Sequence, residues 1–226
     1  MLLQGVHALS EVVALASALA LLAAILSRRP RRAVSPKSRM LFLIAALSRC
    51  APLVLSGAPS LDVALPAALA ALSAASLVLL FVSPPPDEQP DTVFPLWPLV
   101  LGAASVGVGS VALLGLTGSL SALSVSVALW FEVCALVPQY CKIEENGHAS
   151  NFIRLVMAAF GVQMLLSLAY EALEWHLMHV VARLVAIGLY VAWLFFPGFY
   201  FQKHHPLFQA GGGGGGASFD AEVIVL

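Results

Sequence analysis

The stretch ALSEVVALASALALLAAIL, residues 8–26, decides the fold class of this chain. It is long enough to cross the hydrocarbon core of a bilayer, which needs about 20 mostly apolar residues, and it contains one charged residue, Glu11. The basic sequence RRPRR follows at residues 28–32, and no Lys or Arg precedes the apolar run. Because a secretory signal carries its positive charge in front of the apolar segment, we expect residues 8–26 to be a membrane span.

The composition extends this expectation to the whole chain. Of 226 residues, 60% are hydrophobic and 10% are charged, and the formal net charge is −1. A soluble domain has about 25% charged residues, so a soluble enzyme, a disordered chain and a basic nucleic-acid binder are excluded. We expect an all-α integral membrane protein with seven transmembrane helices in a membrane domain of residues 1–201. The predicted spans are residues 8–26, 40–57, 61–82, 95–116, 120–140, 152–173 and 176–201.

The basic residues outside these spans predict the orientation. They lie in the first connection, in the fifth connection and in the tail, which all fall on one face of a seven-span protein. The positive-inside rule therefore places the N-terminus in the lumen and the C-terminus in the cytosol. Residues 202–226 contain a glycine run at 211–216 and are predicted to be a disordered cytosolic tail.

The order of the spans indicates an internal repeat. The fourth span is rich in Gly, Ala and Ser, which let membrane helices approach closely. If it is a bridging helix, spans one to three and five to seven run in the same direction, with a polar connection after the first span of each triplet. This pattern predicts a 3+1+3 arrangement of parallel repeats, in which ligand sites lie between the repeats.

Four ionisable residues inside the spans are the candidate site residues. An ionisable group at bilayer depth costs at least about 2.5–3.5 kcal/mol on insertion scales, so each one needs a partner or a function. Arg49 and Glu132 lie well inside spans that correspond between the repeats, and Arg183 lies in the last span. A guanidinium there can bind a ligand carboxylate through two parallel hydrogen bonds; alternatively, Arg49 and Glu132 neutralise each other as a structural pair. Glu11 is a candidate pH-sensing or proton site, as is Glu132, and the alternative for Glu11 is that it extends to the luminal headgroups.

Two further features of the predicted spans are a proline-glutamine pair and a group of acids and histidines. Pro138-Gln139 ends the fifth span, where a proline frees a backbone carbonyl and permits a kink, so we interpret this pair as a hinge. Acids and histidines gather near the luminal ends of the last two spans, but their spacing supplies no third and fourth ligand, so we expect no metal site. The members of this group are Glu171, Glu174, His176 and His179. We expect no cofactor, no disulfide from the three cysteines, and no enzymatic activity, since no catalytic motif is found.

Two stretches resemble a known family. The first is VSPKSRMLF at residues 34–42, followed by Ser48-Arg49, and the second is FEVCALVPQ at residues 131–139, followed by Gly147 and Ala149. Both are similar to the ER lumen protein retaining receptors, the receptors for KDEL-type signals, and they fall at corresponding places in a chain of seven predicted spans.

The resemblance implies a receptor that cycles between the Golgi and ER membranes. It would bind the C-terminal peptide signals of escaped luminal proteins at acidic pH, release them at neutral pH, and contact vesicle coat proteins at its cytosolic face. Arg49 matches the family arginine that holds the peptide carboxylate, and Glu132 matches its buried glutamate. The chain departs from the family at the first-helix histidine, which is Glu11 here, and at the dilysine-like tail signal, where only Lys203 is found.

The alternative function is a Pro-Gln-loop transporter that couples a small solute to a proton at Glu132 or Glu11. Such transporters commonly carry one Pro-Gln pair in each half of the chain. The first half of this chain has none, which favours the receptor.

Overall fold

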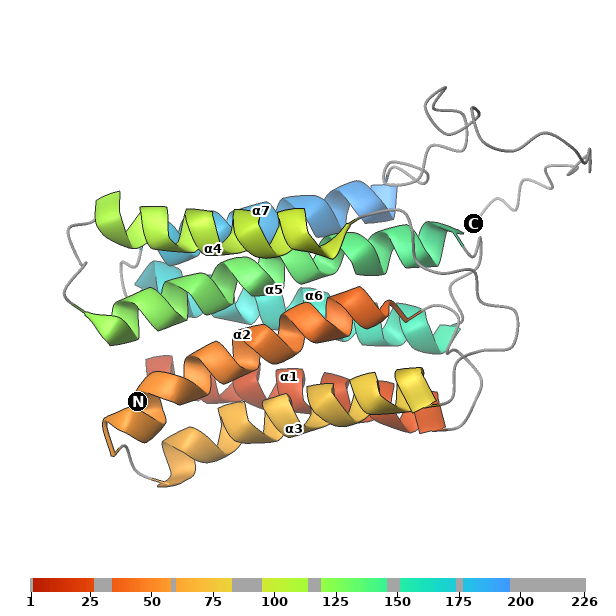
Figure 1. The fold of residues 1–226 in the computed structure, drawn as a ribbon, viewed down its shortest axis with the longest axis horizontal. Helices are drawn as coiled ribbons and strands as arrows, with labels where there is room; N and C mark the ends of the chain where they lie inside the picture. Colours follow the sequence, from red (N-terminus) through yellow and green to blue (C-terminus); the bar gives the residue numbers. More distant parts are fainter. Residues whose placement is uncertain are drawn as a thin grey trace, which may run out of the picture.

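The protein is a bundle of α-helices packed side by side (Figure 1). The computed structural model describes residues 2–26, 34–57, 60–82, 95–113, 119–145, 151–173 and 177–195, and every regular element among them is an α-helix. The helices are α1 (Leu2–Leu26), α2 (Pro36–Leu55), α3 (Ser60–Val82), α4 (Leu96–Leu113), α5 (Leu120–Glu145), α6 (Asn151–Leu173) and α7 (Leu177–Phe195).

Six of these helices, α1 to α6, are long and apolar enough to cross a membrane. In α7 the apolar stretch within the described residues is shorter, His179–Ala192. The described part of the chain is therefore an all-α fold of membrane type. The last predicted span continues to residue 201, and residues 196–201 lie outside the described residues, as does the predicted tail at 202–226.

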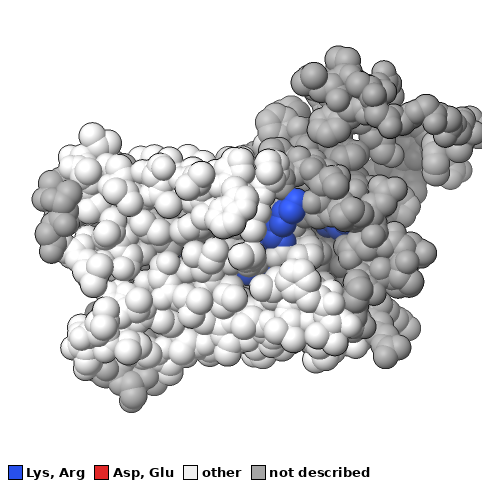
Figure 2. All heavy atoms as spheres, viewed as in Figure 1, with Lys and Arg blue, Asp and Glu red and all other residues white. Residues whose placement is uncertain are grey.

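The outer surface of the bundle is apolar. Large side chains such as Leu55, Val82 and Leu113 are more than two-thirds exposed, which is unusual for a protein surrounded by water. Figure 2 shows one long face on which Lys and Arg atoms occupy only a small area and no acidic atoms are visible. Such a surface fits a bilayer, in which apolar side chains face lipid.

The start of α2 is set by local sequence signals. Ser35 caps the helix by accepting a hydrogen bond on its side chain from the Ser38 backbone N–H at 3.3 Å, and Pro36 occupies the first helical position. These are the residue types preferred at a helix N-cap and at the first position of a helix. Helix α2 therefore begins four residues before the predicted span at residue 40, which brings Arg39 into the helix.

Helix α5 is the centre of the packing. It contacts α2, α4 and α7, and its contact with α2 is the most extensive in the bundle. The next most extensive contacts are those between α2 and α3 and between α1 and α6. One buried apolar cluster combines residues of α1, α5, α6 and α7, including Ile25, Tyr140 and Ile153, and a second joins α2, α4 and α5 around Leu41 and Ala135.

A glycine permits the close approach of α4 to α5. A Cβ atom placed on Gly107 would lie 2.7 Å from the Cα atom of Val127, and the Ser126 hydroxyl donates a hydrogen bond to the Gly107 carbonyl at 3.2 Å. Small residues and hydroxyl groups at such contacts are a general feature of helix packing in membranes.

Replacing Gly107 with alanine should therefore separate α4 from α5. The clash involves backbone atoms, so we expect a loss of about 1–3 kcal/mol in the free energy of unfolding, seen as a lower thermal midpoint of the purified protein in detergent. Gly109→Ala is the matched control, since no atom lies within 4 Å of a Cβ at that position. Equal midpoints for the two variants would contradict the close contact.

Candidate functional site

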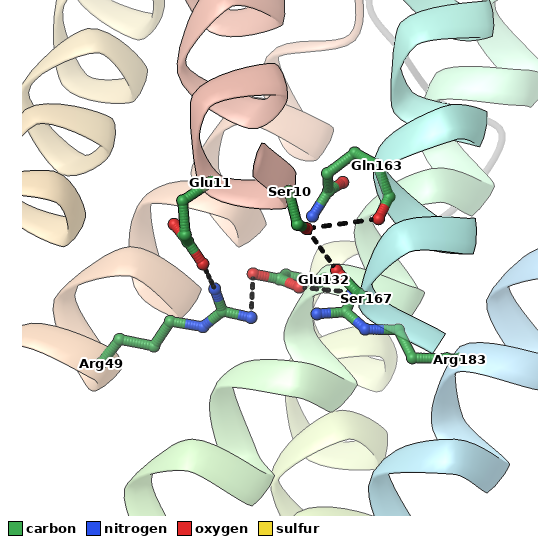
Figure 3. Close-up of polar contacts among 7 residues, drawn as sticks. All are labelled: Ser10, Glu11, Arg49, Glu132, Gln163, Ser167 and Arg183. Carbon is green, nitrogen blue, oxygen red and sulfur yellow. Dashed lines mark hydrogen bonds and ion pairs between the residues drawn. The ribbon is translucent and has the colours of Figure 1, made fainter. Parts of the chain in front are cut away.

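Glu132, on α5, holds two guanidinium groups from different helices. One carboxylate oxygen, Oε1, lies 2.7 Å from Nη2 of Arg49 on α2, and the other, Oε2, accepts a hydrogen bond from Nη1 of Arg183 on α7 at 3.1 Å. Figure 3 shows both arginines pointing toward this carboxylate from opposite sides. The pairing of Arg49 with Glu132 joins α2 to α5, the two helices with the most extensive contact in the bundle.

Glu11 extends this arrangement to α1. Its Oε1 lies 3.8 Å from Nη1 of Arg49, which is an ion pair but too long for a hydrogen bond. The Glu11 side chain is 17% exposed and points toward Arg49 (Figure 3). The four side chains thus form a row of alternating charge across the bundle, in the order Glu11, Arg49, Glu132 and Arg183.

A cavity of about 70 Å³ opens beside these charges. A buried water needs about 10–15 Å³ measured in this way, so the cavity has room for several waters or for a small charged group of a ligand. All four residues of the row line it, and apolar side chains form much of the remaining wall. These apolar wall residues include Phe42, Leu69, Leu136, Phe160 and Met164.

Three polar lining residues, Arg39, Ser73 and Gln163, are not part of the site predicted from the sequence. Arg39, near the start of α2, and Gln163, on α6, both face the cavity. The Ser35-Pro36 signal for the start of a helix could have placed Arg39 inside α2 rather than in the basic connection. Gln163 is an uncharged polar residue in an apolar helix, and that is a weak signal.

Hydroxyl groups join α1 to α6 beside Glu11. The Ser10 hydroxyl lies 2.7 Å from the Ser167 hydroxyl and donates to the Gln163 carbonyl at 3.4 Å (Figure 3). Both serines are buried. Hydrogen bonds of this kind between helices position α1, and they therefore position Glu11, which follows Ser10 directly.

Pro138 and Gln139 lie in α5, about two turns beyond Glu132. Pro138 is fully buried, and the Gln139 side-chain oxygen accepts a hydrogen bond from the Ser35 backbone N–H at 3.2 Å. The glutamine therefore connects α5 to the start of α2. A hinge at this pair stays a prediction.

The group of acids and histidines that was predicted near the ends of the last two spans lies mostly outside the described residues. This holds for Glu174, His176 and the Glu171 side chain, while His179 is half-buried on α7. Among the described residues, no group of three or more His, Cys, Asp or Glu side chains could hold a metal ion.

No protein-family model matches the chain, and no curated protein has significant sequence similarity to it.

The two carboxylates of the row should differ in their importance for stability. In Glu132→Gln, Arg49 and Arg183 both lose the carboxylate that they share, so we expect a loss of about 3 kcal/mol in the free energy of unfolding. In Glu11→Gln the longer pair is lost, and the cost should be below about 1 kcal/mol. Thermal unfolding in detergent measures both variants, and equal destabilisation would contradict the central position of Glu132.

Proposed function

We propose that this chain is a multi-pass membrane receptor of the ER and Golgi that binds C-terminal KDEL-type signals of luminal proteins and returns these proteins to the ER. The observation that carries the proposal is that Arg49, whose side chain is 20% exposed, lines a cavity inside the bundle. The similarity of residues 34–42 and 131–139 to the retaining receptors supports this choice of ligand.

The geometry supports a mechanism of carboxylate exchange. Glu132 holds one side of the Arg49 guanidinium at 2.7 Å, while Glu11 holds another side only loosely, at 3.8 Å. The C-terminal carboxylate of a peptide would replace Glu11 and make the close, charge-assisted hydrogen bonds that Glu11 does not make. A proton on Glu11 would remove the competing charge, so acidic pH would favour binding and neutral pH would favour release.

The packing supports seven spans in a 3+1+3 arrangement. If α1–α3 are matched with α5–α7, the contact of α2 with α5 corresponds to that of α6 with α1. The contacts of α3 with α1 and with α2 correspond likewise to those of α7 with α5 and with α6. Helix α4 then bridges the repeats, and the Arg49–Glu132 pair lies at the interface between them, where such proteins bind ligands.

The proposed orientation places the N-terminus in the lumen and the C-terminus in the cytosol. Lys37, Lys142 and Arg154 lie at the end of the bundle where α2 and α6 begin and α5 ends, and the positive-inside rule assigns that end to the cytosol. Vesicle coat proteins would contact this face.

Peptide binding tests the receptor. We expect a labelled peptide ending in Lys-Asp-Glu-Leu to bind the purified protein as the free acid and not as the C-terminal amide, and to bind more tightly at about pH 5.5 than at about pH 7.4. Arg49→Ala should lower the affinity at least about 100-fold, because a charged group that binds a carboxylate is removed.

Arg154→Ala is the matched control for this experiment. Arg154 is an exposed arginine on α6 that does not line the cavity, so its removal should leave the affinity unchanged. Equal binding of acid and amide, or equal loss in the two variants, would exclude Arg49 as the carboxylate site.

A second candidate function is the proton-coupled transport of a small solute. The observation that favours it is that two carboxylates, Glu11 and Glu132, face one cavity and share the guanidinium of Arg49. A proton that moves onto either carboxylate changes the charge of the cavity, which is the requirement for coupling. Uptake driven by a pH gradient in reconstituted vesicles, with no peptide binding, would favour this function over the receptor.

Glu11→Gln tests the proposed source of the pH dependence. Glutamine carries no charge at either pH, so the variant should bind the free-acid peptide more tightly than the unmodified protein at about pH 7.4, and the difference between the two pH values should be lost. Fluorescence polarisation at the two pH values measures this. An unchanged ratio of the two affinities would assign the pH dependence to another group.

A further inference from the structure

Arg39 is a buried cation for which the described part of the chain supplies no acidic partner. The residue is 4% exposed, and within the described part of the chain no carboxylate lies within 4.0 Å of its guanidinium. Its Nε has no hydrogen-bond partner. The contact that the guanidinium does make is with the ring of Phe42, whose centroid lies 4.8 Å from Cζ.

This cation faces the same cavity as the charged row, and it unbalances the charge there. The row itself is neutral, because Glu11 and Glu132 match Arg49 and Arg183. Arg39 adds a third guanidinium to the lining, so the described side chains around the cavity carry an excess of one positive charge.

The position of Arg39 in α2 increases this imbalance. It is the fourth residue of the helix, and the first turn of a helix carries a partial positive charge that disfavours cations and favours anions. A buried cation that no anion compensates is costly in a low-dielectric interior. The ring of Phe42 offsets only part of this cost, since a cation–π contact is weaker than an ion pair with a buried carboxylate.

We infer that Arg39 forms a second anion-binding site in the cavity, which takes the oxyanion of a carboxylate or phosphate group. Ten residues of α2 separate Arg39 from Arg49, which places their Cα atoms about 15 Å apart along the helix axis. An anion at Arg39 is therefore distinct from the carboxylate proposed at Arg49, and the inference does not depend on a peptide ligand. The oxyanion can come from a soluble ion or from an anionic lipid headgroup.

Thermal unfolding with defined anions tests the site. The purified protein in detergent is titrated separately with sodium phosphate, with sodium acetate and with a short-chain phosphatidic acid in the micelles, each against sodium chloride at equal ionic strength. We expect at least one of the three to raise the thermal midpoint by about 3–6 °C at ten times its dissociation constant. Phosphate or acetate alone would indicate a soluble ion, and phosphatidic acid alone would indicate a lipid.

The variants separate binding at Arg39 from a structural role of this residue. Arg39→Gln should abolish the rise, and Arg39→Lys, which keeps the charge, should retain part of it. Arg154→Gln should retain the full rise, since Arg154 does not line the cavity. In chloride alone, Arg39→Gln should unfold at or above the midpoint of the unmodified protein, because an uncompensated charge is removed.

Two results would overturn the inference. One is the absence of any rise with all three anions, and the other is an equal rise in Arg39→Gln. Neither result would affect the peptide experiment at Arg49, whose readout is the difference between the free acid and the amide. Loss of peptide binding in the Arg49 variant with no anion effect at Arg39 would leave the receptor proposal intact and reject the second site.

Discussion

The carboxylate of Glu132 is the group on which the arrangement of this bundle depends. Charges inside an apolar bundle need partners, and Glu132 supplies one oxygen to Arg49 and the other to Arg183. Since these three residues lie on α2, α5 and α7, the two ion pairs restrict how each helix can rotate about its own axis. Helix α5, which carries this carboxylate, also packs against α4. A shift of α5 would therefore disturb its contacts with α2, α4 and α7.

Hydroxyl groups and small residues position α1, α4 and α6, which carry no residue of the Arg49–Glu132 and Glu132–Arg183 ion pairs. Apolar side chains gain little by leaving lipid for another helix, so close contact and hydrogen bonding decide which helices associate. The Ser10–Ser167 contact at 2.7 Å joins α1 to α6, and Gly107 lets α4 approach Val127 on α5. Glu11 then connects α1 to the charged row. The cavity therefore lies between helices that are joined by polar contacts as well as by the two buried apolar clusters.

The sequence indicated the helices more completely than it indicated the site. Apolar runs predict helices because the bilayer sets their length, and the rarity of charge inside them identified Glu11, Arg49, Glu132 and Arg183. That Arg183 shares the carboxylate with Arg49 could not be deduced, because nothing in one chain gives the rotation of α7 relative to α5. The apolar run that predicts the second span begins at residue 40, which leaves Arg39 in the basic first connection. Ser35 and Pro36 start the helix before it.

The charge balance gives the site its chemical character. In the row of four charges every cation has an anion, so a ligand carboxylate can enter at Arg49 only by replacing one, and the loosely held Glu11 is the carboxylate that it would replace. Such an exchange would leave the charge beside Arg49 nearly constant. At Arg39 nothing has to be replaced, since no acidic side chain of the described residues pairs with it. Under the two proposals, the same cavity would exchange carboxylates at Arg49 and take a further anion at Arg39.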